Sequence, residues 1–450
     1  MKKLQQITAL AFLVIFLMAG CKKRDLEPNI GSLNVTIQVK YDKSGQYFNL
    51  PMEDVEVRME NLWTGRENKA VANNNGLVEF NGASAGNYNI EAIVTIPRDL
   101  FNNLTGQSRN EDVVLSGQLL NHTVNNQLNA PLELEIHVGR QGDLLIKQIY
   151  YAGSSTSNGA SFRDQFLEIY NNSNDTIYAD SLYVAQVMGV NSANPDLSSG
   201  YYLTSGSMVG QYDWSKSIGM VDGSNANDDY IYAKSLYRIP GSGSTYPVAP
   251  GESIVLAQTA VNHQAPYSNN TGGTIAIKDP SLTIDLSQAD FEVFLGPYLA
   301  IPLVSDIDNP AVPDLEMLLY TGKEWILDNL GRDGYAIFKT SEDVENEFKK
   351  YPNPTIKSVT SSTALNYQIP AGLIIDAVEV QPTTAASRVA KRVLGKLDAG
   401  FTFVPGGSFS SESVIRKTAK TINGRKILMD TNNSTQDFDY FTKANPKAFY

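Results

Sequence analysis

Residues that could carry out catalysis are few and scattered in this sequence. Glu168 lies in an apolar run, FLEIYN, with no histidine or paired acid nearby in the sequence, whereas glycoside hydrolysis needs two carboxylates flanking the bond. The chain has three histidines and one cysteine, so a hydroxyl nucleophile has few bases to activate it. No G-x-S-x-G turn is present in the context of a nucleophile. These features predict a protein that is not an enzyme.

One stretch, DIDNPAVPD at 306–314, has the oxygen-rich composition that calcium prefers. Asp306, Asp308 and Asp314 would supply the carboxylates, and two prolines would stiffen the segment. The order does not match an EF-hand loop, and the same residues also suit Asx turns. The sequence has no cluster of histidine and cysteine at zinc or iron spacing. We therefore expect no cofactor other than a structural Ca²⁺ ion.

Aromatic and imidazole side chains are the best candidates for ligand binding. Tyr201, Tyr202, Tyr212 and Trp214 lie among glycine, serine and asparagine, a mixture that suits protein interfaces and carbohydrate stacking. The same mixture also suits ordinary packing of loops against a sandwich. His263 is a candidate for ligand or metal contact, with local hydrogen bonding as the alternative. A metal-dependent hydrolase using His263 with the two aspartates at 306 and 308 stays open as a third reading.

The N-terminal segment predicts export and lipid attachment. MKKLQQITALAFLVIFLMAGC has two lysines, an apolar stretch and small residues before Cys21, which is typical of a secretory signal over residues 1–20. Its end resembles a bacterial lipobox, which implies that Cys21 is acylated and anchors the protein to a membrane. Residues 21–31 are polar and predict a tether. The resemblance implies an outer-membrane lipoprotein exposed at the cell surface.

The net charge excludes one class of partner, and two short motifs indicate a modification. The formal net charge is −12, which argues against nucleic acid, because phosphate binding needs clusters of lysine and arginine. Thr176 and Ser181 each follow an aspartate and precede an apolar residue, a pattern that resembles the periplasmic O-glycosylation motif of Bacteroidetes.

Alternating apolar and polar residues predict an all-β chain. LNVTIQVKY, VEVRMENLWTG and LELEIHV alternate over residues 32–139, with glycine-containing turns between the strands. Gly76, Phe80, Gly86 and Tyr88 are landmarks that make this segment similar to a small prealbumin-like or carboxypeptidase-regulatory-like β-sandwich.

The remainder of the chain, 140–450, resembles a lamin-tail domain, which implies an immunoglobulin-like β-sandwich. The motifs that carry this resemblance are DLLIKQIYYAG, FLEIYN followed by SNDTIYADSLYV, VAPGESIVLAQ, AGLIIDAVEV and a closing DTNNSTQDF. Glu168 then belongs to the pattern of the fold, with Leu167 and Ile169 on one face of a strand and Glu168 on the other. A usual copy is shorter, so we expect large loop insertions at about 185–247 and 259–370.

Three further motifs, TAVNHQ, IDLSQADFEVF and SDIDNPAVPDLEMLLY, resemble a Bacteroidetes lipoprotein family catalogued as a domain of unknown function. Genes of that family often lie beside TonB-dependent outer-membrane receptors. The resemblance implies a non-enzymatic binding or accessory protein that works with such a transporter in nutrient or metal uptake. A structural or adhesive envelope lipoprotein is the alternative.

Overall fold

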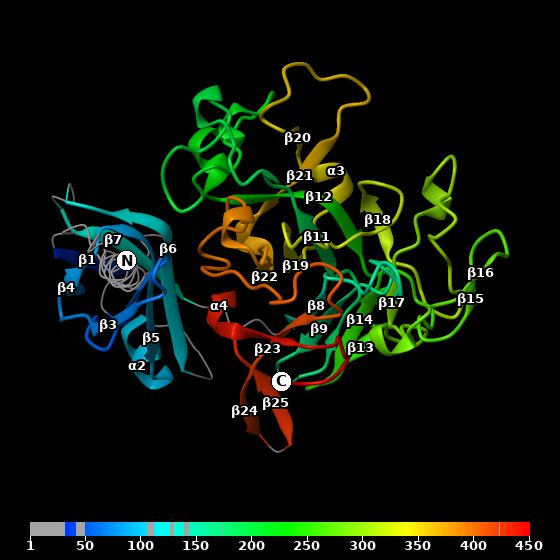
Figure 1. Ribbon diagram of the computed structural model, residues 1–450, viewed down its shortest axis with the longest axis horizontal. Helices are drawn as coiled ribbons and strands as arrows, with labels where there is room; N and C mark the ends of the chain where they lie inside the picture. The colour runs from blue at the N-terminus through cyan, green and yellow to red at the C-terminus, as the bar shows by residue number, and fades with distance from the viewer. Residues whose placement is uncertain are drawn as a thin grey trace, which may run out of the picture.

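The computed structural model describes residues 32–41, 50–105, 112–126, 130–138, 144–173, 175–422 and 424–450. These residues form two β-rich units that lie side by side, the N-terminal one drawn in blue to cyan (Figure 1). The fold is an all-β sandwich, as expected. The expected signal segment, the tether and Cys21 lie outside the described residues.

The N-terminal unit folds one seven-stranded sheet over one core. Its strands run in the order β3-β2-β5-β6-β7-β1-β4, with only β1 and β7 paired in parallel. Strands β3 and β4 at the two ends of the sheet also contact each other. Alternate residues of β1 are buried, as period-two spacing requires. The bounds are β1 Leu33–Tyr41, β2 Glu56–Asn61, β3 Glu67–Val71, β4 Leu77–Ala83, β5 Gly86–Ile96, helix α2 Arg98–Thr105, β6 Val113–Val124 and β7 Leu132–Val138.

The second unit contains two larger sheets and three short hairpins or strand pairs. The six-stranded sheet has the order β17-β14-β9-β8-β23-β26, and the seven-stranded sheet has β20-β21-β12-β11-β19-β22 with β18 paired to β12. The first sheet comprises β8 Leu144–Tyr150, β9 Phe166–Asn171, β14 Ser253–Ala257, β17 Phe291–Glu292, β23 Ser413–Arg416 and β26 Phe438–Phe441. The second comprises β11 Tyr183–Val187, β12 Tyr230–Arg238, β18 Glu316–Leu319, β19 Gly334–Phe338, β20 Lys350–Pro352, β21 Leu365–Pro370 and β22 Ile374–Glu379.

The smaller elements lie around these sheets. The strand pairs are β10 Ile177–Tyr178 with β13 Pro247–Val248, β15 Tyr267–Ser268 with β16 Thr274–Ile275, and β24 Thr418–Ile422 with β25 Arg425–Leu428. The last pair projects from the body near the C-terminus (Figure 1). Two one-turn helices, α3 Val344–Glu347 and α4 Ser434–Asp437, are each capped by the side chain of the preceding residue.

Apolar residues of both large sheets meet in one core. Leu167 and Ile169 of β9 pack there with Ile337 of β19 and Val378 of β22. The opposite faces are also covered, because Phe166 packs into a second cluster and Tyr170 into a third. Every residue of β8, β9, β11 and β19 is therefore buried. The two faces of β9 follow the predicted alternation, and both are interior.

The ranges expected as loop insertions also supply sheet strands. Strand β12 lies within 185–247, while β18, β19, β20 and β21 lie within 259–370, so the insertions are only partly loops and this expectation is corrected. Strand β12 was not predicted from its sequence, YIYAKSLYR. Both of its faces are covered and polar residues lie on both, so apolar and polar residues do not alternate strictly. Irregular chain fills much of the connection from β11 to β12 and of the stretch from β14 to β18, where the only strands among the described residues are the two-residue β15, β16 and β17.

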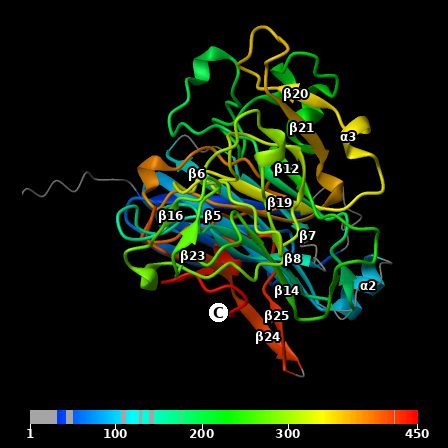
Figure 2. The same ribbon diagram turned by 90° about the vertical axis from the view of Figure 1, so that its right-hand side faces the viewer.

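The two units touch along one face of the N-terminal sheet. The Ser116 hydroxyl of β6 donates a hydrogen bond to the Thr431 carbonyl of the segment before α4, and both residues are buried. The view turned by 90° shows the N-terminal strands behind the larger unit (Figure 2). No helix among the described residues is long and apolar enough to cross a membrane.

Candidate functional site

Glu168 is part of an interior ion pair. Its carboxylate lies 2.8 Å from the Lys147 ammonium of the neighbouring strand β8, and both side chains are fully buried. It also accepts hydrogen bonds from the Gln148 amide at 3.2 Å, the Lys447 backbone N–H at 3.1 Å and the Ser253 hydroxyl. Burial lowers the pKa of Lys147, and the negative charge of Glu168 offsets part of that effect. Through these contacts Glu168 of β9 links strands β8 and β14 and the C-terminal segment.

His263 lies in the interior, away from solvent. Its side chain is fully buried, its Nε2 lies 3.3 Å from the Thr259 carbonyl oxygen, and its ring meets the edge of Tyr267 at 5.4 Å. Burial lowers the pKa of His263 to about 4, so the imidazole is neutral at neutral pH. It does not belong to the acidic group described below. The structure therefore does not bring His263 together with the aspartates of the hydrolase reading.

The predicted aromatic residues form a ladder along the loop between β11 and β12. Tyr202 stacks on Tyr212 at 5.8 Å, Tyr212 meets Trp214 edge-on at 6.0 Å, and Trp214 stacks on Tyr232 of β12 at 3.7 Å. Trp214 is 4% exposed, so its ring packs the loop onto the sheet. Tyr201, Tyr202 and Tyr212 are half-buried. Much of the surface of these rings therefore packs the loop against the sheet.

The two candidate glycosylation residues lie at the surface of one turn region. Thr176 and Ser181 are both exposed, and Ser181 has a positive φ of 58°. The intervening Asp180 is buried and accepts backbone N–H bonds from Gly243, Thr245 and Tyr246. The hydroxyls are thus accessible, while the aspartate next to Ser181 fixes the fold of the turn.

Three carboxylates lie close enough to share a cation. The ligand atoms of Glu292, Asp308 and Asp314 all lie within 4.8 Å of one another, and this is the only such group among the described residues. The predicted Asp306 is not part of it, because it is buried and its carboxylate accepts the Leu295 backbone N–H at 2.9 Å. Glu292 is interior, and its two oxygens already accept backbone N–H groups from Ala260 and Asn309. Only part of a calcium shell is available here.

These carboxylates repel one another, which predicts a pH-dependent stability. Burial, reinforced by charges nearby, raises the pKa of Glu292 to about 7 and that of Asp314 to about 6. Between about pH 4, near the ordinary pKa of these acids, and about pH 7, the folded protein retains protons that the unfolded chain has lost. The free energy of unfolding therefore falls as pH rises through this range. Asp308→Asn removes one charge and is expected to stabilise the protein by about 0.5–1 kcal/mol at pH 8, and by less at pH 5.

Urea denaturation at both pH values measures this difference. The exposed Asp228 is a matched control, and Asp228→Asn is expected to change stability equally little at both pH values. If Asp308→Asn instead destabilises the protein at pH 8, the repulsion account is wrong and a cation holds the carboxylates together. Repeating the titration with CaCl₂ distinguishes these cases, because a bound Ca²⁺ ion would stabilise the parent protein and not the variant.

A large cleft lies between the two units. It has a volume of about 1170 Å³. From the N-terminal unit it is lined by the β2–β3 turn and by β5 and β6, and from the second unit by the loop between β11 and β12 and by the segment after β22. The side chains that matter for its chemistry are Glu60, Trp63, Asn87, His122, Thr123, Asn194, Arg388, Lys391 and Phe401. Clefts between domains are common ligand sites.

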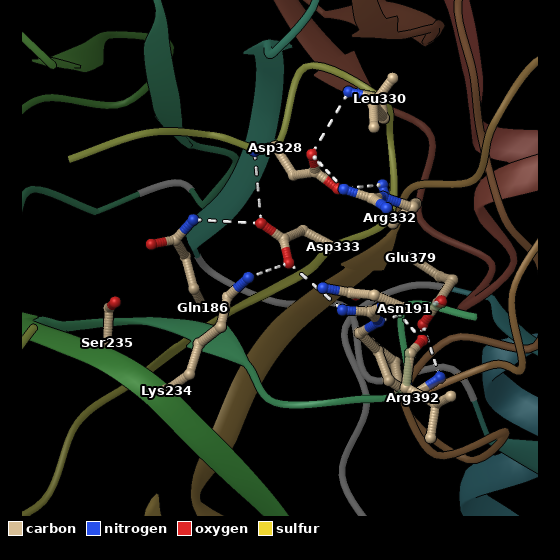
Figure 3. Close-up of polar contacts among 12 residues, drawn as sticks. Gln186, Asn191, Lys234, Ser235, Asp328, Leu330, Arg332, Asp333, Glu379 and Arg392 are labelled. Carbon is tan, nitrogen blue, oxygen red and sulfur yellow. Dashed lines mark hydrogen bonds and ion pairs between the residues drawn. The ribbon is translucent and has the colours of Figure 1, made fainter. Parts of the chain in front are cut away.

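A buried polar network holds the wall formed by the segment after β22. Glu379 accepts the backbone N–H groups of Arg392 at 3.1 Å and Val393 at 2.9 Å. The Arg392 guanidinium, which is also buried, donates to Asp333 at 3.2 Å, and Asp333 in turn accepts from Lys234 and Gln186 (Figure 3). Each charge is paired, as burial requires. The residues just before Arg392, which line the cleft, therefore have a fixed backbone.

The loop between β11 and β12 is fastened to the same wall. The Gln211 amide accepts the Val190 N–H at 2.8 Å and donates to the Ala390 carbonyl at 3.1 Å. Gln381 accepts the Val389 N–H at 3.0 Å and donates to Glu379 at 2.8 Å. Two distant parts of the chain thus share one rigid frame, which is what a preorganised binding site needs.

Trp63, Arg388 and Phe401 were not identified as candidates from the sequence. Trp63 occupies the tight turn NLWTG between two strands, and its side chain is 85% exposed. A large aromatic residue in a β-turn is a signal that could have drawn attention, because turns usually carry small polar residues. Arg388 and Phe401 carry no such signal.

The described residues thus form an all-β protein of two units with a rigid aromatic cleft between them. Residues 249–445 match a family described as protein of unknown function (DUF4876). The expectation of a domain of unknown function is confirmed in this coarser form. No curated protein is significantly similar to the chain in sequence.

Two crystal structures are similar to parts of the chain. One is a DUF4876 family protein from Bacteroides thetaiotaomicron, with 24% sequence identity and a TM-score of 0.49 over 90% of this chain and 94% of that chain. The other is a candidate adhesin from Bacteroides ovatus, with 9% identity and a TM-score of 0.18 over 79% of this chain and 90% of that chain.

Proposed function

We propose that this protein is a non-enzymatic, lipid-anchored binding protein of the outer-membrane surface, and that its ligand site is the cleft between the two β units. It works with a TonB-dependent transporter in nutrient or metal uptake. The observation that carries the proposal is the cleft itself, with its large volume, its exposed Trp63 and its fixed walls. The anchor and the transporter are supported by the N-terminal sequence and by the resemblance to the Bacteroidetes lipoprotein family.

The charges at the cleft favour binding over catalysis. Lys391 is buried and its ammonium donates to the Gly400 carbonyl at 2.6 Å, while Glu379 accepts backbone N–H groups. Burial lowers the pKa of His122, so its imidazole is neutral at pH 7. Lys391 and Glu379 are held by fixed structural partners, and the neutral imidazole of His122 adds no charge, which supports a role in recognition.

Purification from the native outer membrane tests the proposal. The full-length protein, cross-linked in living cells and extracted with detergent, is expected to carry a TonB-dependent receptor with it. Cys21→Ser is the matched control, since without the acylated cysteine the protein is expected to leave the membrane fraction and to lose the receptor.

Recovery of the membrane-bound protein without any receptor would contradict the transporter partnership. A deletion strain that grows normally on limiting nutrients but adheres poorly would favour the structural or adhesive alternative. Cys21→Ser remaining in the membrane fraction would contradict the lipid anchor.

A further inference from the structure

We propose that the cleft binds a neutral oligosaccharide, with sugar rings stacked on Trp63 and on the Phe401 side of the opposite wall. The inference rests on the proposed binding function and deepens it by naming the class of ligand. The exposed aromatic surface, the balance of charge in the cleft and the polar groups of its walls support it.

The exposure of Trp63 is built into the β2–β3 turn. The Asn61 side chain accepts the backbone N–H groups of Trp63 at 3.0 Å and Thr64 at 2.9 Å, and the Leu62 N–H donates to the Asn87 carbonyl at 2.9 Å. The turn is thereby fixed while the indole stays 85% exposed. An indole held in water at the edge of a cleft offers a flat apolar face and one N–H donor, a combination that suits the apolar face and hydroxyls of a sugar.

The opposite wall carries a second flat surface. The guanidinium of Arg388 lies over the ring of Phe401 at 4.6 Å and over that of Phe403 at 5.1 Å. Such stacking fixes the guanidinium plane, so its N–H groups point in set directions. The wall therefore combines an aromatic ring with oriented donors for ligand hydroxyl groups.

The charges in the cleft balance, which argues against ionic ligands. Burial lowers the pKa of Arg388, and the carboxylate of Glu60, which comes from the opposite unit, offsets part of that effect. Of the other groups at the cleft, the imidazole of His122 is neutral, while Lys391 and Glu379 carry opposite charges that attract each other and are hydrogen-bonded to backbone groups. A phosphorylated ligand or a free cation would meet no uncompensated opposite charge, whereas a neutral polyol needs none.

The remaining wall positions supply donors and acceptors. Thr123, Asn194, Ser205 and Ser207 are exposed at the cleft and present hydroxyl and amide groups. Hydroxyls and amides both donate and accept, which matches the hydroxyl groups of a sugar. A volume of about 1170 Å³ exceeds what one monosaccharide fills and is suited to several linked units.

Tryptophan fluorescence tests this proposal selectively. Of the three tryptophans, Trp214 and Trp325 are 4% and 1% exposed, so iodide quenches the emission of Trp63 almost alone. The purified protein is first screened on an array of neutral and anionic plant, host and microbial glycans. We expect a neutral glycan to bind, to protect Trp63 from iodide, and to bind roughly tenfold more weakly to Trp63→Ala.

Two controls separate binding from stability. Val221 is also exposed, does not line the cleft, and Val221→Ala is expected to bind like the parent protein. Trp63→Ala is expected to unfold at the same temperature as the parent, since its ring is in solvent. Binding only to anionic glycans, binding to no glycan, or binding that Trp63→Ala leaves unchanged would each overturn the proposal.

The outcomes also distinguish this proposal from the function it rests on. A neutral glycan that protects Trp63, in a protein recovered without a receptor, supports the ligand class and contradicts the transporter partnership. A receptor recovered with a protein that binds no neutral glycan supports the transporter partnership and contradicts the ligand class.

Discussion

Arg416→Met is expected to lower the free energy of unfolding by roughly 3–5 kcal/mol, because it leaves buried carboxylates without their counter-charge. Arg416 is 2% exposed and lies 2.7 Å from Asp376, 3.3 Å from Asp437 and 3.5 Å from Asp430. Its guanidinium also donates to the Ile146 carbonyl at 2.9 Å and to the Met429 carbonyl at 3.0 Å. One side chain thus joins β8, β22, β23 and the closing segment.

The loss is expected to be larger at pH 8 than at pH 5. Burial raises the pKa of Asp376 and of Asp437 even with Arg416 present, and removing the guanidinium raises both further. Near pH 5 the variant relieves the strain by protonation, whereas at pH 8 it must bury negative charge or unfold.

Urea denaturation at the two pH values measures this loss, with Arg66→Met as the control for replacing an arginine. Arg66 is exposed, and its replacement is expected to change stability by no more than about 0.5 kcal/mol. An equal loss at both pH values would mean that packing, and not charge, explains the effect of Arg416→Met.

The all-β fold is readable from the sequence wherever one face of a strand is buried. Strand β1 alternates between buried and partly exposed residues, and its sequence, LNVTIQVKY, shows that directly. Strand β9 is covered on both faces, yet it remains recognisable as a short apolar run around Glu168. Strand β12 was assigned to an insertion, because its serine, lysine and tyrosine side chains find polar partners inside, which no local pattern encodes.

The candidate sites were harder to predict, since they join residues that are far apart in the sequence. Asp306 was predicted as a ligand because it lies close in sequence to Asp308 and Asp314. In the structure the carboxylate of Asp306 is buried and accepts the Leu295 N–H. Strand pairing instead brings Glu292 to the other two aspartates. The cleft joins Trp63 to Phe401 across two units. Such a site depends on how the units dock, and that is a property of the tertiary structure.

Lys147→Met is expected to destabilise the protein by roughly 3–5 kcal/mol, since it leaves the buried carboxylate of Glu168 without its cation. The replaced ammonium lies 2.8 Å from Glu168 and 3.8 Å from the ring centre of Phe449, with no exposure to solvent. Glu168→Gln leaves the opposite defect, a buried ammonium whose pKa burial already lowers, and is expected to destabilise the protein as well.

The double variant Lys147→Met with Glu168→Leu decides what this carboxylate is for. Replacing both charges by apolar groups of similar size is expected to recover most of the lost stability, because no unpaired charge remains. Glycan binding in the cleft is expected to be the same in the double variant and the parent protein, as a structural role for Glu168 requires. A double variant that regains stability but loses glycan binding would assign Glu168 a part in recognition. A double variant that stays as unstable as Lys147→Met would show that packing around the ammonium, rather than its charge, holds β8 against β9.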